Sequence, residues 1–282
     1  MINLVRSAFA DEYSSDFTEQ LKELNKLNIG YIELRNVDGK NVSELTLSDV
    51  KTVKSKLNDY GVKASSIGSP IGKIKLNGDL AAHLSLSERV FETAAETGAK
   101  YVRIFSFYMP DGVTPKDAKS EVYDNLNKLA ELAKPYGVTL CHENEAAIYG
   151  ESVLNCLEIM ETFKGKIKCV FDMGNFVLDG FNAFDAYKKL FPHIEYFHVK
   201  DSLKAGAVVP PGKGEAEIEK ILSDYKQNGK KDAFITLEPH LQTFGGLNAL
   251  VGKSFDNPYK YDTQEAAFED ANDKLLKILG RI

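Results

Sequence analysis

The chain repeats one hydrophobic pattern, in which a helical stretch ends at a glycine or a polar turn and a short apolar run follows. For example, a helical stretch at residues 80–97 ends at Gly98, and residues 101–105 then read Tyr-Val-Arg-Ile-Phe. Glycine suits such helix ends because it adopts left-handed backbone angles without a steric penalty. Gly30, Gly61 and Gly137 stand in the same position relative to an apolar run. The pattern therefore predicts alternating helices and strands.

The alternation continues along the whole chain. Strands are predicted at residues 3–9, 31–35, 62–67, 101–105, 138–143, 167–172, 196–199 and 234–238. Helices are predicted from residue 16 and at residues 50–60, 80–97, 118–136, 153–163, 183–191, 218–227 and 263–279. Regular alternation implies parallel strands, and about eight such units fit a (β/α)8 TIM barrel. An open doubly wound sheet would have a glycine-rich turn after its first strand, where residues 8–12 contain no glycine. We expect residues 1–282 to form a single barrel domain.

Composition excludes some functional classes. Hydrophobic residues make up 43% of the chain and charged residues 27%, as in ordinary globular proteins. A net charge of −6 argues against a nucleic-acid partner. The three cysteines have no CxxC spacing, which indicates a reducing compartment. Because we find neither a signal peptide nor an apolar run long enough to span a membrane, we expect a cytoplasmic protein. The sequence leaves a homo-oligomer open.

Four apolar runs each end at a side chain that can bind a metal. The four residues are Glu143, Asp172, His198 and Glu238. In a barrel of parallel strands, the carboxyl ends of successive strands meet around one rim, where active sites lie. Three carboxylates and an imidazole suit a hard or borderline divalent cation better than structural zinc. The sequence therefore predicts one divalent metal site.

At these positions the chain resembles the xylose isomerase-like barrels, which include sugar phosphate isomerases and epimerases, tagatose and psicose epimerases, and endonuclease IV. The most specific motifs are His-Glu-Asn at 142–144, Phe-Asp-Met-Gly-Asn at 171–175, His-Val-Lys-Asp at 198–201 and Leu-Glu-Pro-His at 237–240. The resemblance implies that Glu143, Asp172, His198 and Glu238 hold the ion. It also implies manganese as the most frequent metal, with Mg²⁺, Co²⁺ and Zn²⁺ as alternatives.

The resemblance further implies that Glu143 and Glu238 exchange protons with a small carbohydrate. The chemistry agrees, because isomerisation or epimerisation removes a proton next to a carbonyl and passes through an enediolate. The sequence therefore predicts a sugar or sugar phosphate isomerase or epimerase. A keto-inositol dehydratase fits the same site, and a sugar-binding protein without turnover is a third reading.

One position departs from the family pattern. Many relatives carry Asp-x-x-His after the sixth strand, whereas this chain has Asn175 after Asp172. Asparagine can hydrogen-bond a sugar hydroxyl but is a poor substitute for an imidazole ligand. With only five histidines in the chain, this substitution argues against an endonuclease IV-like DNA repair nuclease with several metals.

Other polar residues near predicted strand ends are candidate substrate contacts: Glu33, Arg103, Asn175, Lys200, Lys213 and His240. Lys213 lies in the turn Pro-Gly-Lys-Gly at 211–214, whose amides could receive a phosphate. His142 precedes Glu143 in an extended strand, so its side chain should point toward the helices instead. The long connection at 239–262 is predicted to be a lid, since it combines aromatic residues with glycines.

Overall fold

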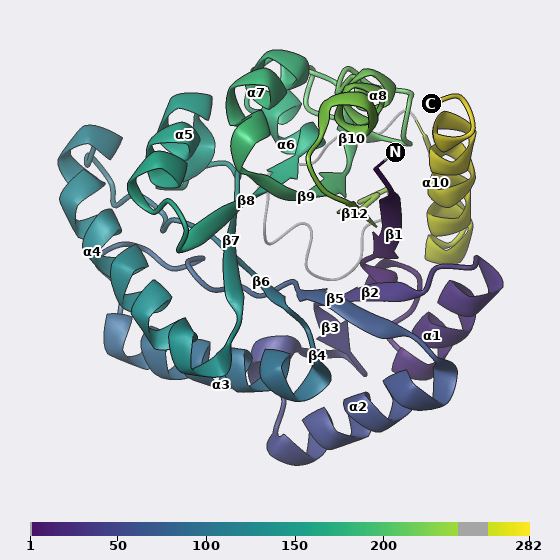
Figure 1. The fold of residues 1–282 in the computed structure, drawn as a ribbon, viewed down its shortest axis with the longest axis horizontal. Helices are drawn as coiled ribbons and strands as arrows, with labels where there is room; N and C mark the ends of the chain where they lie inside the picture. The colour runs from purple at the N-terminus through teal and green to yellow at the C-terminus, as the bar shows by residue number, and fades with distance from the viewer. Residues whose placement is uncertain (1, 242–258) are drawn as a thin grey trace.

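Eight parallel strands form a ring that is enclosed by helices, as Figure 1 shows. The computed structural model describes residues 2–241 and 259–282. Around the ring the strands are ordered β1-β12-β9-β8-β7-β6-β5-β2, and β1 and β2 contact each other where the ring closes. The strands are β1 (Leu4–Ala8), β2 (Tyr31–Leu34), β5 (Lys63–Ile67), β6 (Tyr101–Ile104), β7 (Thr139–Glu143), β8 (Ile167–Asp172), β9 (Ile194–Val199) and β12 (Ala233–Leu237). The predicted (β/α)8 barrel is confirmed.

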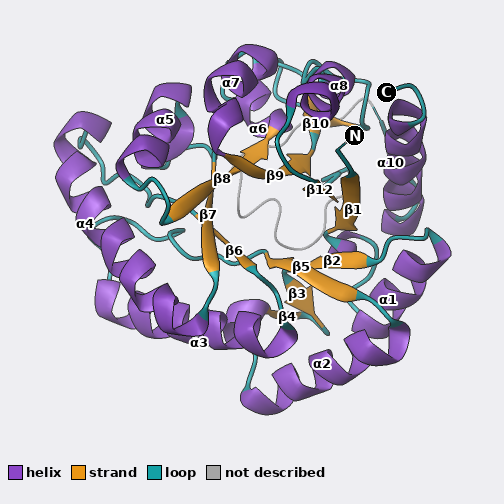
Figure 2. Cartoon of the chain, in the orientation of Figure 1, coloured by secondary structure: helices purple, strands orange, loops and turns teal. Residues whose placement is uncertain are grey.

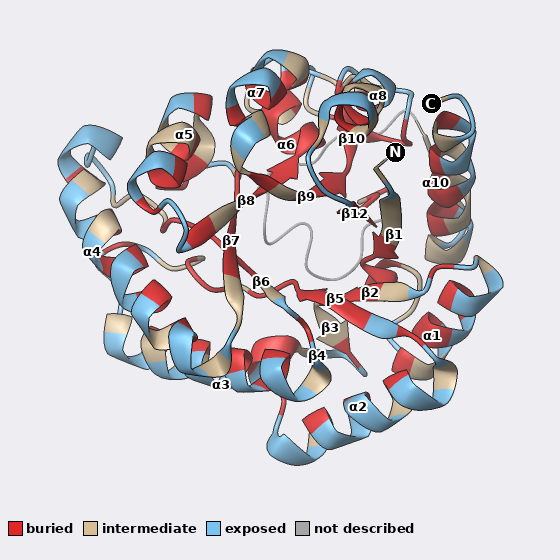
Figure 3. Cartoon of the chain, viewed as in Figure 1, coloured by how far each residue is buried: buried red, intermediate tan, exposed pale blue. Residues whose placement is uncertain are grey.

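Helices cover the outside of the ring (Figure 2). They are α1 (Phe17–Lys26), α2 (Leu47–Tyr60), α3 (Leu80–Thr97), α4 (Pro115–Ala133), α5 (Val153–Thr162), α6 (Met173–Leu178), α7 (Ala183–Leu190), α8 (Ile218–Asn228) and α10 (Gln264–Leu279). On these helices the buried residues lie on the side toward the strands, and the exposed residues lie on the outer side (Figure 3). In the described parts of the chain, no helix is both long and apolar enough to cross a membrane.

Short elements were missed by the sequence pattern. They are helix α6 and the two-residue strands β3 (Asn36–Val37), β4 (Lys40–Asn41), β10 (Asp201–Ser202) and β11 (Val208–Val209). Elements of this length contain too few residues to show a hydrophobic period. The helix ends agree better with the prediction, since Gly61 and Gly98 adopt left-handed angles after α2 and α3. After α1, however, Asn28 takes the left-handed conformation, with φ at 54°, in place of Gly30.

A small cluster of mostly apolar side chains fills the barrel interior below the carboxyl ends of the strands. It consists of Cys141, Val170 and Tyr196, with Tyr101 and Phe234 packed against it. Side chains two residues apart on a strand share a face, so the residues two positions further along also point into the barrel. Those residues are Glu143, Asp172 and His198. Strand alternation therefore places an apolar layer directly below the metal-competent side chains.

Candidate metal centre at the carboxyl ends of the strands

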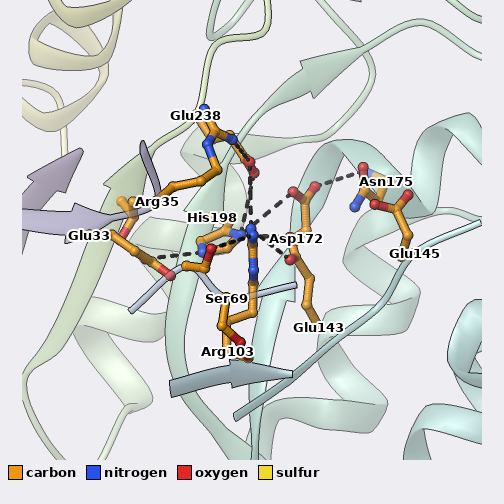
Figure 4. A network of polar contacts seen from close by, with 12 residues as sticks. Glu33, Arg35, Ser69, Arg103, Glu143, Glu145, Asp172, Asn175, His198 and Glu238 are labelled. Atoms are coloured by element: carbon orange, nitrogen blue, oxygen red, sulfur yellow. Dashed lines mark hydrogen bonds and ion pairs between the residues drawn. The ribbon is translucent and has the colours of Figure 1, made fainter. Parts of the chain in front are cut away.

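The four predicted metal ligands meet at one point of the barrel rim (Figure 4). Glu143, Asp172, His198 and Glu238 each offer one ligand atom, and these atoms all lie within 4.8 Å of one another. All four residues are buried. Residues from β7, β8, β9 and the position after β12 thus converge as the strand-end rule predicts.

The imidazole of His198 stands at the middle of the group. Its Nδ1 lies 2.6 Å from Glu143 Oε1, 3.4 Å from Glu238 Oε2 and 4.0 Å from Asp172 Oδ2. One ring nitrogen therefore faces three carboxylates at once. We name this group of four residues the centre.

A side chain next to the centre ties two of its strands together. Asn144 Oδ1 accepts a hydrogen bond from the backbone N–H of Asp172 at 3.1 Å, and Asn144 Nδ2 donates to the Asp172 carbonyl at 3.1 Å. The paired bonds fix the end of β8 relative to the end of β7, and thereby the spacing of Asp172 and Glu143. Sequence reasoning placed Asn144 in a motif but gave it no role.

Cationic side chains surround the carboxylates. Lys200 Nζ lies 2.9 Å from Asp172 Oδ2 and 3.2 Å from Glu238 Oε2. Arg103 Nη1 lies 3.2 Å from Glu143 Oε2 and 3.8 Å from Glu238 Oε1. These buried cations stabilise the ionised form of the acids, because charges interact strongly where water is excluded.

The two glutamates are held ionised despite their burial. Burial alone would raise the pKa of Glu143, but His198 and Arg103 outweigh it and lower this pKa to about 2. Burial opposes ionisation of Glu238 as well, yet Lys200, His240 and His198 bring its pKa well below the usual range. Both side chains are therefore carboxylates at neutral pH, the form needed for a metal ligand or a base.

The pKa values of Asp172 and His198 are raised, in contrast to those of the two glutamates. Burial raises the pKa of Asp172 to about 7, and Lys200 only partly opposes this rise. Burial alone would lower the pKa of His198, but Glu143, Glu33 and Glu238 raise it well above its ordinary value. A cation is thus favoured at this point, either as a proton on the ring or as an ion that replaces it.

The donor set fits a divalent metal. Three carboxylate oxygens and one imidazole nitrogen match the preferences of Mn²⁺, Mg²⁺ and Zn²⁺. Glu238 Oε2 is buried and makes no hydrogen bond with the described residues, although it lies 3.2 Å from Lys200 Nζ and 3.4 Å from His198 Nδ1. The centre can therefore hold one divalent cation.

Asn175 and Lys200, two predicted substrate contacts, lie directly beside the centre. Asn175 Oδ1 accepts a hydrogen bond from Lys200 Nζ at 3.1 Å, and its Nδ2 donates to the Asn144 carbonyl at 2.9 Å. The backbone N–H of Asn175 donates a hydrogen bond to Asp172 Oδ1 at 2.7 Å, so that Asp172 caps the start of α6. Asn175 therefore holds Lys200 and Asp172 in place.

His240 reaches the other side of Glu238. Its Nε2 lies 3.3 Å from Glu238 Oε1 and 3.3 Å from Glu12 Oε1. Arg35 Nη1 lies 3.0 Å from the same Glu238 oxygen, and Arg35 also pairs with Asp11 and Glu12. Of this cluster, His240 was predicted as a substrate contact, whereas Asp11 and Glu12 were not, although this polar pair directly follows the first strand.

Glu33 and Lys213 take different positions relative to the centre. Glu33 is 1% exposed and contacts His198 Nε2 from beneath the centre, at 3.2 Å. Lys213 is exposed, and its side chain makes no polar contact with the described residues of the centre. The adjacent amides of Gly212 and Gly214 donate to Asp201, so they are not available for the phosphate that the sequence suggested. Most of the predicted lid at 239–262 lies outside the described residues.

Known proteins resemble this chain in sequence and in structure. A probable L-ribulose-5-phosphate 3-epimerase from Mycoplasma pneumoniae is 28% identical over 148 residues, which are 51% of this chain and 48% of that protein. The match thus spans about half of the relative's length. Among solved structures, D-psicose 3-epimerase with D-fructose has a TM-score of 0.75 at 18% identity, covering 97% of this chain and 98% of its own.

A second solved structure is similar over its whole length. The IOLI protein with a bound zinc atom has a TM-score of 0.74 at 20% identity, covering 100% of this chain and 99% of its own. At such identities the structural matches establish the fold. The sequence itself matches the pattern described as xylose isomerase-like TIM barrel over residues 21–257, and the chain belongs to that family.

Proposed function

We propose that this protein is a metal-dependent isomerase or epimerase of a sugar or sugar phosphate, in which Glu143 and Glu238 transfer protons. The observation that carries the proposal is the convergence of two buried, ionised glutamates on His198 Nδ1, at 2.6 Å and 3.4 Å. The relatives named as psicose and ribulose-5-phosphate epimerases support a carbohydrate substrate.

Glu143, Asp172, His198 and Glu238 would hold the ion, for which we propose Mn²⁺, with Mg²⁺, Co²⁺ or Zn²⁺ as substitutes. A bound divalent ion would supply Lewis-acid polarisation of the sugar carbonyl and its neighbouring hydroxyl. That polarisation acidifies the adjacent C–H bond, on which the protein's own bases then act.

The two glutamates divide the proton transfer. Because both are ionised at neutral pH, either can remove the proton beside the carbonyl and leave an enediolate. If the same carboxyl group returns the proton to the neighbouring carbon, the sugar is isomerised. For epimerisation, the second glutamate takes up a proton from water and delivers it to the opposite face of the original carbon, and the first glutamate releases to water the proton that it removed.

Arg103 is the best placed of the predicted contacts to bind a substrate oxygen. It is 6% exposed, and its Nε–H is buried without a hydrogen-bond partner among the described residues. Its Nη1 already lies near both proton-transferring glutamates. A sugar hydroxyl accepting from Arg103 would satisfy this donor and bring the reacting carbons between the carboxylates.

A panel of ketoses and their phosphates, incubated with the protein and Mn²⁺ in deuterated water, tests the proposal. We expect deuterium at the carbon beside the carbonyl, loss of this exchange with EDTA, and its return with added Mn²⁺. Absence of exchange in the metal-loaded protein would contradict the proposal. Loss of water from a keto-inositol under the same conditions would favour the dehydratase alternative.

A further inference from the structure

A buried polar network lies beneath the centre, with Glu33 of β2 at its middle. Glu33 Oε1 accepts a hydrogen bond from the Tyr196 hydroxyl at 2.9 Å, and Oε2 accepts from the Thr236 hydroxyl at 2.9 Å. Oε2 also lies 3.2 Å from His198 Nε2. The Tyr196 hydroxyl is linked in turn to Ser66 Oγ at 2.9 Å. The side chain of Glu33 has no exposed surface.

Glu33 faces the inside of the barrel from β2. Its side chain reaches His198 (Figure 4), and hydrogen bonds from Tyr196 and Thr236 orient its carboxylate toward that ring. The neighbouring strand is irregular here, because Ile32 pairs with Ala64 and Glu33 pairs with Ser66, which leaves Ser65 as an extra residue in β5. Such irregularities are frequent beside active sites.

The two nitrogens of His198 face different groups. Nδ1 faces Glu143, Asp172 and Glu238, whereas Nε2 faces only Glu33 among the described carboxylates of the site. A ring nitrogen that binds a metal must carry no proton, so the single proton of the neutral ring must then be on Nε2. A carboxylate fixed at Nε2 favours this arrangement and also makes Nδ1 a stronger donor to the metal.

We propose that Glu33 is a positioning residue that holds the proton of His198 on Nε2 and thereby directs the Nδ1 lone pair to the divalent ion. This role replaces a contact between Glu33 and substrate. It rests on the metal site of the proposed function but requires no particular sugar. Tyr196 and Thr236 support it because they hold the Glu33 carboxylate in a fixed orientation.

Mn²⁺ affinity of purified variants, measured by the electron paramagnetic resonance signal of the free ion, provides the first test. Removing such a partner of a metal-binding histidine typically weakens metal affinity about 10- to 100-fold. We expect a loss in this range for Glu33→Leu, and a loss below about tenfold for Glu33→Gln, whose amide oxygen can still accept the Nε2 proton.

Glu23 offers a matched control. Its carboxylate is also buried, at 4% exposure, but it pairs with Lys26 on α1, outside the barrel. Glu23→Leu and Glu23→Gln should therefore leave Mn²⁺ affinity unchanged. If folded Glu33→Leu binds Mn²⁺ as tightly as the Glu23 variants do, the role of Glu33 is refuted.

The location of the proton gives a second test, which needs no destabilising variant. In the Zn²⁺-loaded wild-type protein labelled with ¹⁵N-histidine, we expect His198 to carry its proton on Nε2, with Nδ1 bound to the metal. A proton on Nδ1 would overturn the proposal even if Glu33→Leu fails to fold. Failure of the wild-type protein to bind either ion would instead overturn the metal site itself. Absence of sugar turnover affects neither readout.

Discussion

Buried carboxylates at two places in this barrel find their polar partners in different ways. At the first place a single carboxylate, that of Asp201, lies after β9 and beside the turn at 211–214. Its Oδ1 accepts hydrogen bonds from the backbone N–H groups of Ser202 at 2.9 Å and Ala216 at 3.1 Å, and its Oδ2 accepts from Gly212 at 2.8 Å and Gly214 at 2.9 Å. Four amides thus satisfy one carboxylate, and no cationic side chain in the described part of the chain pairs with it.

The centre is the second place, and its carboxylates face one another. Across Glu143, Asp172 and Glu238, a single backbone amide among the described residues donates to a carboxylate oxygen, from Asn175 to Asp172. The remaining charge is balanced by buried cationic side chains, and one oxygen of Glu238 keeps no hydrogen bond. The comparison teaches that a carboxylate enclosed by amides organises a loop, whereas carboxylates that converge without amides provide a cation site.

The largest expected effect concerns the converging carboxylates of the centre. At saturating Mn²⁺ and with the sugar identified by the deuterium assay, Glu143→Gln and Glu238→Gln should each lower kcat by about 10²- to 10⁴-fold, since an amide cannot accept the proton. Glu145→Gln is the control, because Glu145 pairs with Lys73 at 2.9 Å and lies outside the centre. A glutamate variant of the centre that keeps kcat within tenfold would show that its carboxylate does not transfer the proton.

For Asp201, the comparison predicts that a substitution lowers stability without weakening metal binding. Asp201→Asn removes one acceptor oxygen and turns an NH₂ group toward backbone donors, so we expect the free energy of unfolding to fall by about 3 kcal/mol. The affinity for Mn²⁺ should stay within about threefold of wild type, by the usual limit for sites with no shared partners.

Asp232→Asn serves as the control for that measurement. Its carboxylate also accepts a backbone N–H, from Asn3 at 2.8 Å, but this contact is exposed to solvent. We therefore expect a smaller cost in urea unfolding than that of Asp201→Asn. An equal cost for the two variants would mean that the buried amides around Asp201 add nothing, and a marked loss of Mn²⁺ affinity in Asp201→Asn would mean that the two groups are coupled.

The convergence of the four candidate ligands was predictable from sequence, because a barrel brings the ends of successive parallel strands together. Glu143 and Asp172 end apolar runs, and parallel strands bring such ends to one rim. Glu238 was predicted from the same rule even though β12 ends at Leu237, since a shift of one residue leaves it at the rim. The packed environment of His142 was likewise readable from strand alternation alone.

The partners of these ligands were harder to predict. The ion pairs of Arg35 with Glu12 and Glu238 were not predicted, because they join residues that are distant in sequence. The orientation of the Glu33 carboxylate depends on hydrogen bonds from Tyr196 and Thr236, which are distant in sequence. The turn at 211–214 has the composition of an anion-binding loop, yet its amides belong to Asp201. Gly214 is required there because a Cβ would lie 2.2 Å from Asp201 Oδ1.

Two consecutive residues of β7, His142 and Glu143, also differ in this way, one having a structural role and the other a place in the centre. The smallest expected effect is the change in stability with pH that His142 causes. Glu143 points into the centre, whereas His142 is buried outside it, where its Nε2 lies 2.9 Å from Ser106 Oγ. Burial lowers the pKa of His142 to about 4, below the value near 6.5 of an unfolded chain. Between these values the unfolded state binds more protons, so stability is full above pH 6.5 and falls as the pH is lowered.

At about 1.4 kcal/mol per pH unit, His142 should remove up to about 2 kcal/mol of stability between pH 6.5 and 5. Urea unfolding at both pH values gives, for the wild type and for His142→Gln, the slope of the free energy of unfolding against pH. The difference between the two slopes is the contribution of His142. Other groups, including Asp172, titrate in both proteins and cancel in that difference. Identical slopes would show that His142 is not held neutral by packing, and the assignment of one strand to two separate roles would then be wrong.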